Sequence, residues 1–176
     1  MLVLGIDPGT ATTGYGVVRA DRPSSPVLVE CGVIRTRARD ALPARLAEIH
    51  EGVRELIARH RPDVLSLEDI FFARNVRTTV VLGHARGVIM LAAHQGGIPV
   101  HEFSPSAIKK AVVGTGAASK EQVQFMLTRL LRLKSVPTPS DAADGVATAL
   151  TYVMSAHLDA LAEAARTRSR LAWPGA

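Results

Sequence analysis

Four carboxylates stand at places where the pattern of the chain does not require a charge: Asp7, Glu68, Asp141 and Asp144. Asp7 ends the apolar run from residue 2 to 6 and is followed by Pro8, and Glu68 ends the apolar run that begins at Val64. A short apolar run bounded by turn residues predicts a buried strand. A charge at the end of such a strand is costly unless it is paired or binds a cation.

The spacing of these acids predicts that they converge. If the first strand and the strand ending at Glu68 are parallel neighbours, their ends lie roughly 4.8 Å apart, and Asp7 and Glu68 face a common spot. Asp141 and Asp144 are three residues apart at the start of a predicted helix, so they share one of its faces. We therefore expect the helix to direct both of them back toward the strand ends.

Such a set of acids suits divalent metal chemistry. Mg²⁺ prefers oxygen ligands, and two ions about 4 Å apart can hold the attacking and the leaving oxygen of a phosphodiester. One ion would activate water and the other would stabilise the 3′ leaving oxygen. No His or Cys lies near these acids in sequence, which argues against zinc. The pattern suits two Mg²⁺ ions, and it leaves open whether Mn²⁺ can substitute.

Each acid also has an ordinary explanation. Asp is favoured in turns such as Asp7-Pro8-Gly9, and Glu68 at a strand end is compatible with a surface position. Residues 138–141 resemble a helix capping box, and acids near a helix N-terminus are stabilised by its dipole. The metal hypothesis therefore depends on the combination of the four.

Composition limits the classes of protein to consider. The chain has 176 residues, 47% hydrophobic and 21% charged, which suits one globular domain. Its net charge of +5 weakly favours a polyanionic partner. Cys31 is the only cysteine, so no internal disulfide or zinc cluster is expected. No signal peptide is expected, and no apolar run of membrane-spanning length lacks charge, so we expect a cytoplasmic protein without a membrane partner.

Periodicity predicts three strands followed by alternating helices and strands. The expected strands are 2–6, 14–19, 27–35, 64–68 and 98–103, and the expected helices are 43–60, 75–95, one beginning at 105, 119–133 and 140–165. Short links between the first three strands indicate an antiparallel meander, and the later units indicate parallel additions. We predict an α/β fold with a five-stranded mixed sheet and helices on both faces. Residues 1–160 would form the single domain, and 161–176 a polar tail that can be disordered.

Taken together, the motifs resemble the RuvC family of Holliday-junction resolvases. The matching stretches keep their order from residue 2 to about 156: 4–10 with 13–17, Glu68 with Phe71 and Asn75, 82–87, Lys109 through 112–116 to Lys120, and 141–144. The resemblance implies an RNase H-like fold, a homodimer and an Mg²⁺-dependent endonuclease. Its substrate would be a four-way DNA junction, cut by paired symmetric nicks that leave 5′-phosphate and 3′-hydroxyl ends. A further implied partner is the RuvA–RuvB branch-migration complex.

The resemblance also implies roles for individual residues. Asp7, Glu68, Asp141 and Asp144 match the catalytic metal ligands of the family; some members have His at the position of Asp141. Phe71 matches a phenylalanine that stacks near the crossover, although a core position is the ordinary alternative. Lys109 and Lys120 match the loop lysines; Lys110 follows directly, so either Lys109 or Lys110 is a candidate for the phosphate contact.

Other DNA contacts are less specific in the pattern. Asn75 belongs to the family match, and several arginines are candidates for the junction arms: Arg35, Arg37, Arg39, Arg74, Arg77 and Arg86. The predicted helix 75–95 is rich in small residues, which marks it as a candidate dimer contact. The alternative is close packing on its own sheet.

Three other functions are compatible with parts of the pattern. The run from Gly5 to Thr10 also resembles the phosphate hairpin of sugar kinases and actin-like ATPases, but those proteins need two such domains. A catalytically idle DNA-binding module is disfavoured, because four carboxylates without metals would repel phosphate. A related RNase H-like nuclease acting on another substrate, such as an RNA–DNA hybrid, fits less well with Phe71 and the two lysines.

Overall fold

The fold is built on one mixed β-sheet. The computed structural model describes the backbone of residues 1–22, 25–69 and 76–171, and the side chains of these residues as far as 163. In this part of the chain, five strands lie in the order β3-β2-β1-β4-β5. They are β1 (Leu2–Asp7), β2 (Thr12–Arg19), β3 (Val27–Arg35), β4 (Val64–Glu68) and β5 (Val100–Phe103).

Strand directions place two of the predicted site residues side by side. β1, β2 and β3 pair antiparallel, whereas β4 pairs parallel to β1 and β5 pairs parallel to β4. The prediction of a meander followed by two parallel strands is therefore confirmed. Because Ile6 pairs with Leu67, the residues that follow them, Asp7 and Glu68, lie at the same edge of the sheet.

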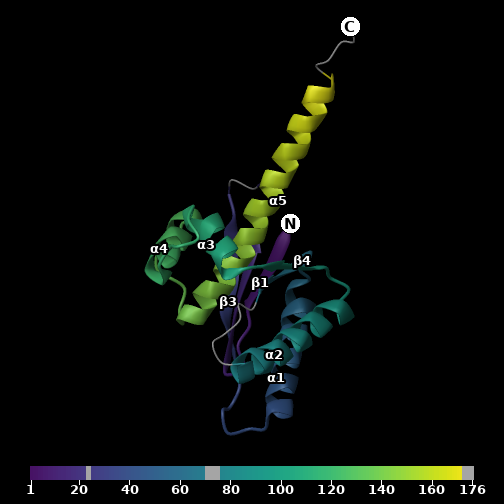
Figure 1. The fold of residues 1–176 in the computed structure, drawn as a ribbon, viewed down its shortest axis with the longest axis vertical. Coiled ribbons are helices and arrows are strands. Elements are labelled where there is room, and N and C mark those ends of the chain that lie inside the picture. The colour runs from purple at the N-terminus through teal and green to yellow at the C-terminus, as the bar shows by residue number, and fades with distance from the viewer. Residues whose placement is uncertain (23–24, 70–75, 172–176) are drawn as a thin grey trace.

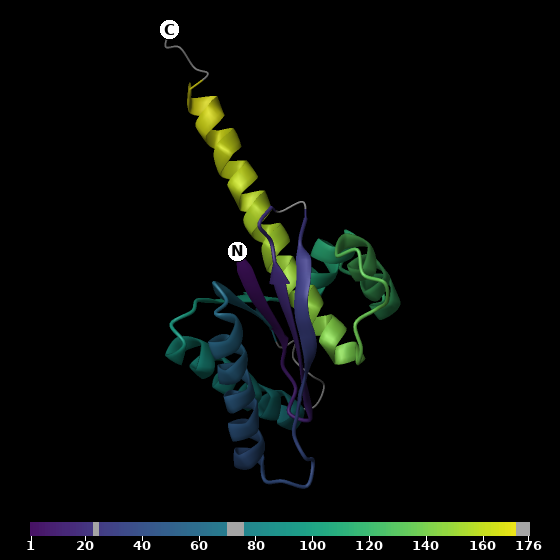
Figure 2. The ribbon, with the colours of Figure 1, turned by 180° about the vertical axis from the view of Figure 1, so that it is seen from behind.

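Helices cover both faces of the sheet, as predicted (Figures 1 and 2). They are α1 (Leu42–His60), α2 (Val76–Gln95), α3 (Pro105–Val113), α4 (Lys120–Leu130) and α5 (Ser140–Leu171). Leu4, Leu65 and Leu67 pack with α1 and α2 in one core cluster. Val3 and Val64 pack with α3, α4 and α5 in the other.

This alternation decides where the strand-end acids point. Side chains along a strand alternate between the two faces, so Asp7 shares its face with Val3, and Glu68 shares its face with Val64. Ser66 confirms the direction for β4, since its hydroxyl donates to the carbonyl of Thr148 in α5 at 2.8 Å. Asp7 and Glu68 therefore belong to the face that α5 covers.

Glycines let α5 lie directly on the sheet. A Cβ added to Gly5 would be 2.2 Å from the backbone nitrogen of Ala149, and one added to Gly145 would be 2.5 Å from the Cα of Tyr15. No side chain fits at either contact, because such separations are far inside van der Waals distance. This close approach brings the first turns of α5, with Asp141 and Asp144, to the ends of β1 and β2.

The element boundaries differ from the predicted ones by a few residues. β5 begins at Val100 rather than 98, and α4 ends at Leu130 rather than 133. The largest difference is at the end of α5, which continues to Leu171 instead of ending near 165. The second half of α5 projects beyond the other elements in Figure 1, so no contact with the sheet marks its end in the sequence. The division into a domain of residues 1–160 and a tail stays a prediction.

α2 is long and apolar enough to span a membrane by length and composition alone. This evidence is weak, since a helix that packs inside a globular fold passes the same test. Ala85, Ile89, Ala92 and Ala93 of α2 are buried in the core with α1 and the sheet. The expectation of a protein without a membrane partner stays a prediction.

Candidate active site

Asp7 and Glu68 form an electrostatically strained pair at the edge of the sheet. Burial, followed by the charges of Glu68, Asp144 and Asp141, raises the pKa of Asp7 to about 8, with Lys120 acting in the opposite direction. Burial and Asp144 likewise raise the pKa of Glu68 to about 7, while Lys120, Lys109 and a hydrogen bond from Asp7 act in the opposite direction. Both shifts favour the protonated forms, because burial and the neighbouring negative charges make it costly to ionise both carboxylates.

Lys120 supplies the positive charge nearest to these acids. Its ammonium nitrogen lies 2.6 Å from Oδ2 of Asp144, and this contact is the main reason that the pKa of Lys120 is raised. The local sequence explains the placement, since Ser119 caps α4 in a capping box with Gln122 and Lys120 is the first residue of the helix. Lys120 is half exposed, so the ammonium is also accessible from solvent.

Four of these groups line one cavity of about 240 Å³. Asp7 and Glu68 enter it from the sheet, Asp144 from α5 and Lys120 from α4. Lys109 of α3 lines it as well, together with apolar residues of α3, α4 and α5. A larger hollow of about 700 Å³ between α1 and α2 has no carboxylate among its lining residues and offers no comparable chemistry.

Other predicted site residues lie at some distance from this cavity. Asp141 is close enough for its charge to raise the pKa of Asp7, but it does not line the cavity. Lys110 lines a separate apolar pocket between α3 and α5, so of the two adjacent lysines it is Lys109 that faces the acids. Arg77 is exposed near the start of α2.

Three predicted DNA contacts, Phe71, Arg74 and Asn75, fall on residues 70–75, outside the described residues, and so does Phe72. This segment directly follows Asp69, one residue after Glu68. Their predicted roles stay predictions.

The donor set fits a hard divalent cation in kind, since it consists of carboxylate oxygens around one cavity. No three Asp, Glu, His or Cys side chains among the described residues stand in a ready-made metal cluster, however. A physical reason is that the ammonium of Lys120 binds Asp144, while burial favours the protonated forms of Asp7 and Glu68. A cation would have to displace both of these positive charges.

Sequence reasoning missed two features that shape this site. One is the pair of glycines, Gly5 in β1 and Gly145 in α5, that lets the helix pack directly on the sheet. The position of Gly5, two residues before Asp7 on the same face of β1, was the sequence signal for this close packing. The other is the pair of contacts that Arg86 makes with Asp69 and Glu102. Nothing in the sequence pairs a helix arginine with acids on two separate strands.

Comparisons with known proteins identify the relatives of this chain. The profile of the family described as "Crossover junction endodeoxyribonuclease RuvC" matches residues 3–152 of this chain. A protein of that name from Syntrophomonas wolfei is 42% identical over 169 residues, covering 96% of this chain and 98% of its own length. The chain belongs to the RuvC family.

Solved structures extend the likeness to three dimensions. The structure titled "T. thermophilus RuvC in complex with Holliday junction substrate" superposes with a TM-score of 0.86 at 36% identity, covering 90% of this chain and 96% of that one. The RuvC of Moorella thermoacetica is 48% identical over 153 residues, covering 86% of this chain and 90% of its own. The five-stranded sheet with helices on both faces in the described residues is the RNase H-like fold predicted from the RuvC resemblance.

Proposed function

We propose that this protein is a structure-specific endonuclease that resolves four-way DNA junctions by paired symmetric nicks, in recombination and repair. The observation that carries the proposal is the convergence of Asp7, Glu68, Asp144 and Lys120 on one cavity in a chain of the RuvC family. The junction bound to the T. thermophilus relative supports the choice of substrate. The expected products carry 5′-phosphate and 3′-hydroxyl ends.

In this proposal, Asp7, Glu68, Asp141 and Asp144 hold two Mg²⁺ ions, for which Mn²⁺ can substitute. When bound, the metal supplies an activated water and stabilises the leaving oxygen of the phosphodiester. The raised pKa values of Asp7 and Glu68 support the assignment, because a site with excess negative charge gains most from a cation. Binding of a cation would favour the ionised forms of both carboxylates and so make them available as ligands.

Lys120 and Lys109 would hold the scissile phosphate. Lys120 bonds to Asp144 in the absence of metal and would turn its charge to the phosphate when Asp144 binds the cation. Lys120 also opens α4, where unpaired backbone N–H groups attract anions. The predicted contacts near the crossover and the junction arms remain Phe71, Arg74, Asn75 and Arg77. Lys110 is a weaker candidate for the phosphate contact than Lys109, because it lines another pocket.

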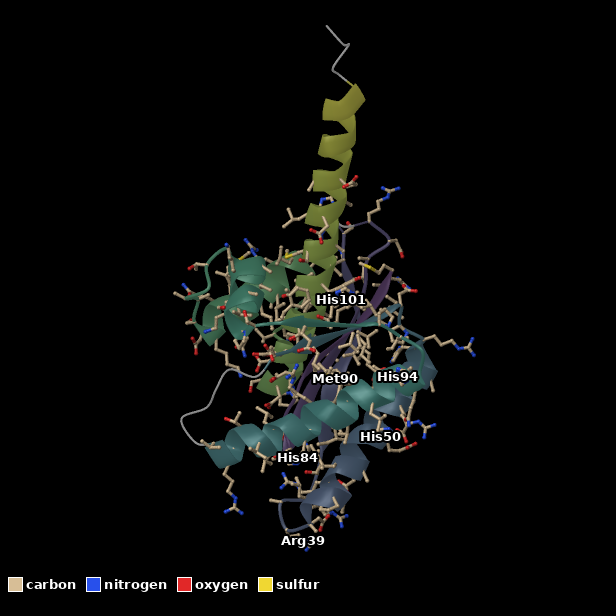
Figure 3. All side chains as sticks on the ribbon, turned by 45° about the vertical axis from the view of Figure 1, so that its right-hand side comes forward. Arg39, His50, His84, Met90, His94 and His101 are labelled. Atoms are coloured by element: carbon tan, nitrogen blue, oxygen red, sulfur yellow. The ribbon has the colours of Figure 1, made fainter. Side chains whose placement is uncertain are left out.

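The proposed enzyme is a homodimer, since two opposed strands must be cut. An exposed stripe on α2 supports this: Val76, Val80, Gly83, Gly87 and Met90 follow one another at intervals of three and four residues. Methyl groups on Gly83 or Gly87 would meet nothing within 4 Å in the described residues, so a second backbone can approach closely there. In Figure 3 no other helix or strand lies in front of this part of α2, where Met90 and His94 are labelled.

The dimer can be tested by sedimentation. Val80→Asp puts a charge into the stripe and should convert dimer to monomer, whereas Thr78→Asp, exposed on another face of α2, should not. Equal sedimentation of both variants and the wild type as dimers would remove α2 from the interface. We further propose a cytoplasmic location and coupling to a RuvA–RuvB branch-migration complex, supported by membership in the RuvC family.

The activity is tested directly with synthetic DNA. Purified protein is given a four-way junction, a duplex of the same sequence and an RNA–DNA hybrid, each with and without Mg²⁺. We expect paired nicks in the junction alone, and only with Mg²⁺. Preferential cutting of the hybrid would instead assign the protein to another RNase H-like activity, and cutting of the junction in the presence of a chelator would exclude the metal mechanism.

A further inference from the structure

Arg86 of α2 joins three elements beside the candidate active site. Its Nη1 lies 3.1 Å from Oδ1 of Asp69, at the end of β4, and its Nη2 donates to Oε2 of Glu102 in β5. Only 15% of the side chain is exposed, although α2 is otherwise exposed along much of its length. The guanidinium is therefore committed to contacts within the protein.

These contacts argue against the sequence-based assignment of Arg86 to a junction arm. Both of its terminal nitrogens are used by carboxylates, and its Nε is buried without a partner among the described residues. The ion pairs with the two acids must offset the free-energy cost of this unsatisfied N–H. The forked contact with two acids is a geometry that arginine provides and lysine does not.

Asp69 is held from two directions. Its side chain is bound by Arg86, and its backbone N–H donates to the carbonyl of Phe103 at 2.8 Å, which extends the pairing of β4 with β5 by one residue. Asp69 is covalently joined to Glu68, the proposed metal ligand. Any change in the direction of the chain at Asp69 therefore changes the direction of the Glu68 carboxylate.

We infer that Arg86 is a positioning residue for the metal site: by holding Asp69 it fixes the direction of Glu68, and it ties this edge of the sheet to α2. The inference rests on the proposed function of Glu68 as a metal ligand. Arg86 also keeps Asp69 and Glu102 neutralised beside a cavity that already has an excess of carboxylates. Loss of partners that orient metal ligands typically lowers metal affinity or activity by about 10–100-fold.

The test compares Arg86→Met with Asp69→Asn, which breaks the same contact from the other side. Asp69 is half exposed, so its variant is the safer one for folding. Arg54→Met is the matched control, since Arg54 is a helix arginine that also contacts a carboxylate, Glu51, but on the exposed side of α1. Arg86→Lys shows whether charge alone is sufficient.

Mn²⁺ binding to the protein without DNA, measured by calorimetry, is the first readout. We expect about 10-fold weaker binding for Arg86→Met and for Asp69→Asn, an intermediate loss for Arg86→Lys and no change for Arg54→Met. The double variant should be no worse than either single one, because both break one contact. Junction affinity without metal should stay within about 2-fold, while the single-turnover cleavage rate falls and recovers at high Mn²⁺.

Two results would overturn the inference. One is Mn²⁺ binding by Asp69→Asn equal to that of Arg54→Met, and the other is additive losses in the double variant. Failure of the proposed function would give a different result. The wild-type protein would leave the junction uncut, but calorimetry, which needs no DNA, would still show weaker Mn²⁺ binding by Arg86→Met than by Arg54→Met.

Discussion

Asp7 and Glu68 stand at the ends of two neighbouring strands, whereas Asp141 and Asp144 lie in the first turns of α5. The strand acids end two neighbouring inner strands, β1 and β4, of the sheet in the described residues, and burial raises the pKa of each. Of the helix acids, Asp144 is already bound to Lys120. The strand acids therefore fix the position of the proposed metal site, whereas a helix acid such as Asp144 can exchange its contact with Lys120 for one with a cation.

The largest expected effect comes from changing a strand acid. Asp7→Asn keeps the shape of the side chain and removes its charge, so junction binding should be retained within about 2-fold while cleavage in Mg²⁺ falls by at least ~10³-fold, because a metal ligand supplies several kcal/mol to the transition state. Single-turnover cleavage and a binding assay in Ca²⁺ measure the two effects. Near wild-type cutting would show that Asp7 is a turn residue and no ligand.

The next effect separates the lysines. Lys120→Met should lower the cleavage rate by about 100-fold by removing a charge from the phosphate position, and it should change stability by less than ~1 kcal/mol because the ion pair is half exposed. Lys110→Met, on the same side of the sheet but lining another pocket, is the control and should cut within a few-fold of the wild type. Equal losses of activity in the two variants would mean that Lys120 has no specific role in the cavity and that both lysines contribute only to general DNA affinity.

A smaller effect tests how α5 brings its acids to the sheet. Gly145→Ala places a methyl group against the backbone of Tyr15 and should lower the free energy of unfolding by about 1–3 kcal/mol, despite the helix propensity of alanine. Ser155→Ala, further along α5, should change it by less than about 0.5 kcal/mol. Urea unfolding measures both. A stable Gly145→Ala protein with full activity would mean that α5 does not need this close contact.

A further prediction is a pH dependence of stability in metal-free buffer. The folded-state pKa of Asp7 is raised from 3.8 to about 8, so its contribution to stability is fully present below about pH 4 and is lost as the pH rises through about 8. Glu68, raised from 4.5 to about 7, acts with the same sign. Asp7→Asn should therefore lose less stability than the wild type between about pH 5 and about pH 9 in urea unfolding with a chelator. If wild type and Asp7→Asn lost the same stability with rising pH, the pH dependence would not come from the Asp7 carboxyl group.

The strand acids could be predicted from the sequence because strand ends follow from local pattern. Asp7 and Glu68 each end an apolar run, and two parallel neighbours must bring such ends together. The antiparallel meander was predictable for the same reason, since short links between β1, β2 and β3 leave few alternatives. The family match then added roles that the pattern alone left open.

Contacts between distant elements could not be predicted in this way. Arg86 was among the arginines predicted for the junction arms, yet its carboxylate partners are Asp69, directly after β4, and Glu102 in β5. The choice between Lys109 and Lys110 could not be predicted because it depends on which face of α3 packs against the rest of the protein. That face carries Ile108 and Val112, which are buried. The sequence did not predict the continuation of α5 to Leu171, because that part of the helix projects away from the sheet and needs no pattern of buried apolar residues (Figure 2).

Crystals soaked with Mn²⁺ and examined by anomalous scattering test the central claim most directly. The account predicts metal density at roughly 2.1 Å from carboxylate oxygens of Asp7 and Glu68, with at least one helix acid completing the site. The ammonium of Lys120 should then have left its position 2.6 Å from Asp144. Saturating Mn²⁺ without density at Asp7, and with the Lys120–Asp144 contact intact, would contradict the account.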